Sequence, residues 1–145
     1  MKQRHQAYQA ALEQINKVMI DGYFLEAIAL EECSISNCLF NYLQNTGAKL
    51  NSPSFYLLVK SMPQHSVDSF LIERINHWRD ARNIAIHGFI FSRSEGFSQS
   101  REDFHRLSKA TAEEGATYCK EIVSWYEVEC VSFIKHQFST QRRLH

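Results

Sequence analysis

The sequence has few residues that interrupt helices and no long apolar segment. Its 145 residues include only five glycines and two prolines, and no alternation of apolar and polar residues persists along it. This composition indicates a mostly α-helical chain rather than a sheet protein. No stretch approaches the roughly 20 apolar residues of a membrane span, and the N-terminal segment has no apolar run typical of a signal peptide. We therefore expect a cytoplasmic protein without a membrane partner.

Excess charge and metal-binding motifs are also lacking. The 16 basic residues balance the 16 acidic ones, so any contact with nucleic acid requires a local patch rather than bulk charge. The four cysteines have no C-x-x-C spacing, and the histidines form no H-E-x-x-H pair. No G-x-S-x-G motif or phosphate-binding loop occurs. We expect free, buried thiols in a reducing compartment, no metal ion and no other cofactor.

What is present is a set of helical segments separated by short polar turns. Apolar residues recur at three- and four-residue steps, and Asp21-Gly22 and Asn45-Thr46-Gly47 interrupt them. We predict a single all-α domain over residues 1–145, an up-and-down bundle of four to five helices with a frayed tail over 139–145. The predicted helices are 3–20, 23–44, a short one capped by Ser52 with Pro53 at its first position, one from Ser66 or Asp68 to Gly88, and a long one starting near Ser100 after a loop over 91–100.

Two of these helices carry a charged residue within an apolar stripe. Glu32 falls in the stripe of the second helix, and Arg82, within RDARNIAIHG (79–88), falls in that of the helix ending near Gly88. A buried charge is unfavourable unless it is paired, so we predict a buried Glu32–Arg82 ion pair. The apolar members of the stripes are Leu25, Ile28, Ile35, Leu39 and Leu43 in the second helix, and Val67, Leu71, Ile75, Trp78, Ala81 and Ala85 in the other.

The same residues also permit a catalytic interpretation. Arg82, Asn83 and His87 could meet in a cleft, where the arginine would bind an anion and the histidine would move a proton. On the first interpretation, His87 only interacts with the dipole at the helix C-terminus. The two interpretations are compatible, because a carboxylate such as Glu32 can orient a catalytic arginine.

The segment from Arg82 to His87 resembles the Arg-x(4–6)-His motif, often with Asn after the Arg, of the HEPN superfamily of small helical ribonucleases. Trp78 ahead of the motif, the helix containing YFLEAIALEE and the long closing helix are similar to the family arrangement. The resemblance implies an HEPN-like homodimer whose two motifs face one cleft. It implies metal-independent cleavage of RNA to 2′,3′-cyclic phosphate and 5′-hydroxyl ends, with Arg82 and His87 catalytic, Asn83 assisting and Glu32 supporting.

The resemblance further implies a toxin or anti-phage defence setting, with RNA as substrate and a possible cognate antitoxin as partner. HEPN toxins paired with nucleotidyltransferase antitoxins often have a modifiable Tyr two residues after the His, and here that residue is Phe89. Silencing through that hydroxyl is therefore not expected. The alternative from a different class is a non-catalytic helical dimer that binds RNA or a protein, with the motif kept for structure.

Overall fold

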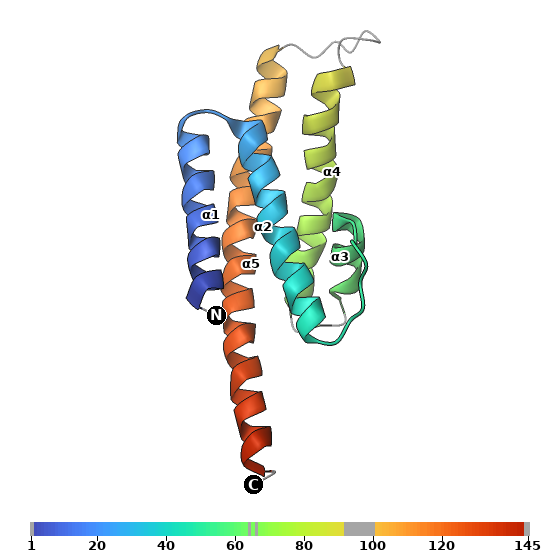
Figure 1. The fold of residues 1–145 in the computed structure, drawn as a ribbon. Helices are drawn as coiled ribbons and strands as arrows, with labels where there is room; N and C mark the ends of the chain where they lie inside the picture. The colour runs from blue at the N-terminus through green and yellow to red at the C-terminus, as the bar shows by residue number, and fades with distance from the viewer. Residues whose placement is uncertain (1, 64, 66, 92–100, 144–145) are drawn as a thin grey trace.

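The computed structural model describes residues 2–63, 65, 67–91 and 101–143, with the side chains of 2 and 88–91 excepted. In this part of the chain every regular element is a helix, which confirms the predicted all-α bundle. Figure 1 shows the long helices running alternately up and down, with a short helix beside the lower parts of α2 and α4. The helices are α1 (Lys2–Ile20), α2 (Phe24–Asn45), α3 (Phe55–Ser61), α4 (Ser69–Phe91) and α5 (Arg101–Arg143).

Capping side chains decide where the two middle helices begin. The Oδ1 atom of Asp68 accepts a hydrogen bond from the backbone N–H of Phe70 at 2.9 Å, so the predicted start at Asp68 is confirmed. The predicted cap of the short helix was wrong. Ser54, not Ser52, has the extended backbone of an N-cap, and its Oγ accepts from the N–H of Leu57 at 3.3 Å. Ser52 instead has a positive φ of 43°, within the turn that precedes α3.

Two helices are longer than predicted. α4 continues to Phe91, so the predicted stop at Gly88 was wrong. A single glycine within a helix lowers its stability by only about 1 kcal/mol relative to alanine, which is not enough to end the helix. α5 continues to Arg143, through most of the segment expected to fray. The predicted loop over 91–100 and the cap at Ser100 lie almost wholly outside the described residues.

The hydrophobic core lies where α5 contacts α1, α2 and α4. Trp78 of α4 is only 1% exposed, and its Nε1–H donates to the carbonyl oxygen of Thr111 on α5 at 2.9 Å. This bond links the helix that carries Arg82 to the central helix of the bundle. The other large side chains that are fully buried in the core include Tyr118, Ile28, Ile35, Leu39, Leu43, Met62, Ile75 and Ile122.

Gly115 allows α5 to approach α2 and α4 closely. A Cβ atom at this position would lie 2.6 Å from Cζ2 of Trp78 and closer still to Oε1 of Glu31, and both of these side chains are fully buried. We expect Gly115→Ala to lower the free energy of unfolding by roughly 1–3 kcal/mol through overpacking. Urea unfolding followed by circular dichroism measures the change.

The matched control for this substitution is Thr117→Ala, at an exposed position on the same helix. It supplies the helix propensity of alanine without the close contacts, so its stability should equal or slightly exceed that of the wild type. Equal stability of Gly115→Ala and Thr117→Ala would contradict the close packing at Gly115.

Candidate functional site around the Arg82–Glu32 ion pair

Arg82 of α4 and Glu32 of α2 form the predicted ion pair. The Nη1 atom of Arg82 lies 3.0 Å from Oε2 of Glu32, and the two side chains are 16% and 25% exposed. The ion pair is therefore shielded rather than fully buried, whereas the sequence predicted a buried pair. The guanidinium Cζ lies 5.9 Å from the ring centroid of Phe55 on α3, so Arg82 contacts two other helices. Its Nε–H is buried without a hydrogen-bond partner among the described residues.

Glu32 borders an open groove as well as the ion pair. The groove has a volume of about 640 Å³ and lies between α2 and the segment that leads into α3. Asn37, Ser36 and Ser52 supply polar atoms to its lining, and Phe40 and Leu58 supply apolar ones. Arg82 does not line this groove, but its guanidinium has five N–H donors and one carboxylate partner at 3.0 Å, so donors remain for a second acceptor.

The carboxyl group within the buried face of α2 belongs to Glu31, not to Glu32. Glu31 is 0% exposed, and neither of its carboxyl oxygens has a hydrogen-bond partner in the described part of the chain. Burial raises the pKa of Glu31 to about 9, so the side chain is uncharged at neutral pH. Of the five apolar residues predicted for this stripe, Ile28, Ile35, Leu39 and Leu43 are buried, and the prediction was wrong for Leu25, which is exposed. Ile28 and Ile35, three residues before and four after Glu31, were the signal that could have identified it.

Asn83 and His87 follow Arg82 on α4 but do not converge with it. Asn83 is half-buried and His87 is exposed. Five residues along a helix correspond to roughly 140° around its axis, so His87 faces outward while Arg82 faces α2. Across the described residues, no hydrogen bond or ion pair joins these three side chains. One copy of the chain therefore does not bring Arg82 and His87 to a single point.

His87 belongs to a continuous exposed stripe, here named the outer face of α4. Its members are spaced three or four residues apart and all point away from the core. Two of them are large apolar side chains, Phe70 and Ile84, which are 63% and 58% exposed. Ile84 is one turn before His87, so an apolar contact is available beside the histidine. The outer face comprises Phe70, Glu73, His77, Asp80, Ile84 and His87.

Breaking the ion pair should destabilise the fold, because it leaves a shielded arginine without its carboxylate. We expect Glu32→Gln to lower the free energy of unfolding by about 1–3 kcal/mol, measured by urea unfolding. The control is Asp80→Asn, which breaks the pair with Arg79 (3.4 Å; 64% exposed at Asp80) and should change stability by less than about 1 kcal/mol. A Glu32→Gln protein no less stable than Asp80→Asn would show that Glu32 and Arg82 are not coupled.

The cysteines are all free, but their environments differ. Cys38 and Cys119 are buried, and burial raises the pKa of both thiols to about 12, so neither is a nucleophile at neutral pH. Cys33 is exposed, so the prediction of buried thiols was wrong for that residue. Within the residues that the structure describes, no three His, Cys, Asp or Glu side chains are grouped as a metal site requires.

Comparison of the chain with protein-family models, with curated proteins and with solved structures gave no match. In the described ranges, no helix has both the length and the apolar character needed to cross a bilayer. The fold and the site define an all-α bundle in which a shielded Arg–Glu pair connects two helices and an exposed histidine follows on one of them.

Proposed function

We propose that this protein is a metal-independent endoribonuclease of the HEPN type that acts as a homodimer. Arg82 and His87 are its catalytic residues, Asn83 assists them and Glu32 orients the arginine. The observation that carries the proposal is the arrangement on α4: Glu32 holds Arg82 by an ion pair of 3.0 Å, while His87 remains exposed on the same helix.

These residue types suit cleavage of RNA without a metal ion. The 2′-oxygen attacks the adjacent phosphorus, the bond to the 5′-oxygen breaks, and a cyclic phosphate and a 5′-hydroxyl result. A base must take the 2′-hydroxyl proton and an acid must protonate the departing 5′-oxygen, and histidine can perform either step near neutral pH. Arg82 stabilises the charge that develops on the phosphoryl oxygens. Asn83, one turn before His87, donates to phosphate or orients the imidazole.

The geometry of α4 supports a composite site in a dimer. One histidine cannot be both acid and base in one step, and Arg82 and His87 of one chain point in different directions. Pairing of two α4 helices through their outer faces brings the two His87 side chains together, so that one can act as the acid and the other as the base. Ile84, 58% exposed beside His87, gives such a pairing an apolar contact.

The biological setting follows from the resemblance at residues 82–87. A small HEPN ribonuclease of this kind acts in the cytoplasm as a toxin or as an anti-phage effector, with RNA as substrate and a possible antitoxin protein as partner. The balanced net charge of the chain favours a defined RNA over indiscriminate binding.

One observation favours a second candidate, a non-catalytic helical dimer that binds RNA or a protein. The guanidinium of Arg82 is already paired with Glu32 and lies over Phe55, so the arginine contributes to structure whether or not it binds phosphate. On this alternative, the motif connects α2, α3 and α4.

Incubation of total RNA with the purified protein in EDTA tests the proposal. We expect fragments that end in a 2′,3′-cyclic phosphate and begin with a 5′-hydroxyl, which polynucleotide kinase labels directly. The control for a contaminating nuclease is His87→Ala protein purified in the same way. Absence of cleavage by a folded, dimeric wild-type protein would favour the non-catalytic candidate, and a monomer in sedimentation would contradict the composite site.

A further inference from the structure

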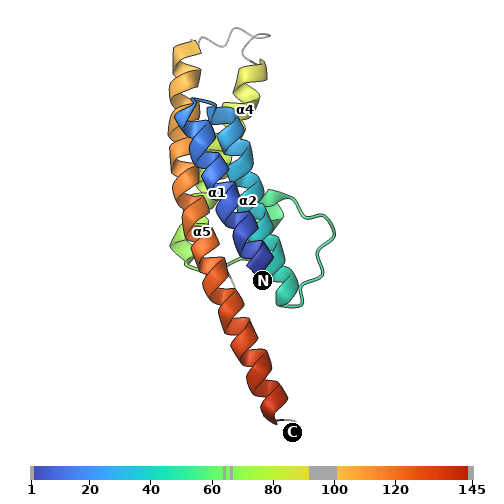
Figure 2. The same ribbon diagram turned by 60° about the vertical axis from the view of Figure 1, so that its left-hand side comes forward.

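A cavity of about 510 Å³ lies between the N-terminal turns of α1 and the second half of α5. Figure 1 places the N-terminus of α1 and the end of α4 that carries His87 at opposite ends of the bundle. Figure 2 shows that α5 extends well beyond the first turn of α1, which leaves one side of this part of α5 uncovered. The cavity is therefore separate from the candidate ribonuclease site, and its volume is in the range of small-molecule sites.

The cavity has an apolar wall that the described bundle covers only in part. Val131 is 49% exposed, and Phe133 and Ile134 are half-buried. At the inner end, the rings of Tyr8 and Tyr126 meet edge to face with centroids 5.5 Å apart. An apolar surface of this shape favours an aliphatic or aromatic group over water.

A buried hydroxyl without a partner lies in the same lining. Tyr126 is only 3% exposed, and its hydroxyl oxygen has no hydrogen-bond partner of normal geometry in the described ranges. Buried hydroxyls in proteins nearly always have a partner. Burial and the neighbouring Cys130 raise the pKa of Tyr126 to about 12, against an opposing effect of Arg4. The hydroxyl is thus a protonated donor close to a guanidinium.

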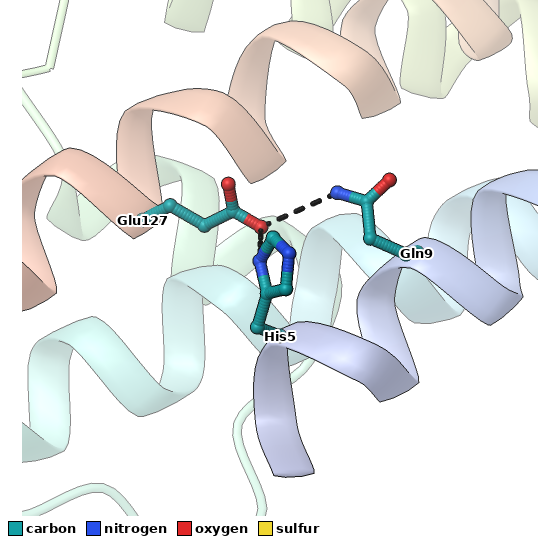
Figure 3. A network of polar contacts seen from close by, with 3 residues as sticks. All are labelled: His5, Gln9 and Glu127. Atoms are coloured by element: carbon teal, nitrogen blue, oxygen red, sulfur yellow. Dashed lines mark hydrogen bonds and ion pairs between the residues drawn. The ribbon is translucent and has the colours of Figure 1, made fainter. Parts of the chain in front are cut away.

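The one carboxylate among the described lining residues, Glu127, is paired with α1 and leaves Arg4 available to bind an anion. Figure 3 shows one carboxylate oxygen of Glu127 facing both His5 and Gln9: Oε1 lies 2.6 Å from Nδ1 of His5 and accepts from Nε2 of Gln9 at 3.4 Å. The Glu127 carboxylate is therefore already occupied by α1. Arg4, which also lines the cavity, has no carboxylate partner among the residues described. Two hydrogen-bond donors, one of them cationic, thus stand beside an apolar wall.

We propose that this cavity binds a small amphipathic monoanion, a carboxylate on a medium-length aliphatic chain. The carboxylate accepts hydrogen bonds from the Arg4 guanidinium and the Tyr126 hydroxyl, and the chain lies against Val131, Phe133 and Ile134. The site is independent of the ribonuclease proposal, so His87→Ala protein binds the same ligand as the wild type.

Calorimetric titration with decanoate tests the proposal, and decyltrimethylammonium serves as a probe with the same chain and opposite charge. We expect saturable binding of one decanoate per chain, at least about ten-fold tighter than the cation. Tyr126→Phe and Arg4→Gln should each weaken decanoate binding on the order of ten-fold. Tyr126→Phe removes a hydroxyl that has no hydrogen-bond partner of normal geometry among the described residues, so its melting temperature should not fall.

The matched control is Tyr23→Phe, an exposed tyrosine at the N-cap of α2, which should bind decanoate as the wild type does. Equal binding of decanoate and the cation, or unsaturable uptake of both, would overturn the proposal. Wild-type affinity in both Arg4→Gln and Tyr126→Phe would overturn it as well. The proposal would also be overturned if decanoate did not bind because a second copy of the chain fills the cavity. Sedimentation at the same concentrations would reveal that dimer.

Discussion

Glu31→Gln should make the protein more stable at pH 8 and reduce the dependence of its stability on pH. Glu31 is fully buried against Gly115 and Trp78, without a hydrogen-bond partner in the part of the chain described. Burial raises its pKa from 4.5 to about 9. Glutamine has nearly the same shape and does not ionise, so it removes the titration and retains the packing.

The sign follows from linkage between protonation and folding. Below pH 4.5 the carboxyl is protonated in both states, and Glu31 has no pH-dependent effect on stability. Between pH 4.5 and about 9 the unfolded chain releases the proton while the folded chain retains it, so stability falls by about 1.4 kcal/mol per pH unit. Close to pH 9 the accumulated loss is on the order of 5 kcal/mol.

Urea unfolding of wild-type and Glu31→Gln protein at pH 5, 6, 7 and 8 measures this difference. We expect the free energy of unfolding of Glu31→Gln to exceed that of the wild type by a larger amount at each higher pH. Glu13→Gln, at an exposed position of α1, is the control and should follow the wild type throughout. A gap between wild type and Glu31→Gln that stays constant over this pH range would show that Glu31 is hydrated or paired in solution.

His87→Ala should reduce the rate of RNA cleavage by roughly 10²–10⁴-fold, the usual contribution of a general acid or base. The proposed composite site uses this histidine from both copies, so one substitution removes both proton-transfer groups. His87 is exposed, and its replacement should leave the melting temperature nearly unchanged. Initial rates on a defined RNA oligonucleotide in EDTA, together with a circular dichroism melt, measure both effects.

His77→Ala is the matched control, because His77 is another exposed histidine on the outer face of α4, ten residues earlier. It should retain the wild-type rate within about three-fold, since the proposal gives His77 no part in proton transfer. Equal loss in both variants would indicate that the outer face binds RNA without His87 acting on it chemically. Wild-type rates in both would exclude His87 from the reaction.

Much of the bundle was predictable from local patterns. Scarce glycine and proline and the three- and four-residue spacing of apolar positions were enough for the helix class and for the main helices. Asp68 was one of two candidate starts, with Ser66, and its side chain reaches a backbone N–H two residues away without any contribution from a distant part of the chain. The Glu32–Arg82 contact was also predictable, because opposite charges at apolar positions are unfavourable unless they pair with each other.

The tertiary structure decided which side of each helix is buried and where each helix ends. Periodicity alone locates an apolar face to within about one residue, or 100° of rotation, and that step separates buried, uncharged Glu31 from the ion-paired Glu32. The choice between them depends on where α5 contacts α2, and Gly115 makes that approach possible. The cavity at Tyr126 depends in the same way on α1 and α5, which are distant in sequence. The amino-acid sequence thus determined the helices and the residue types available to them. The packing of distant helices determined which carboxyl group is neutral and which hydroxyl lacks a partner among the described residues.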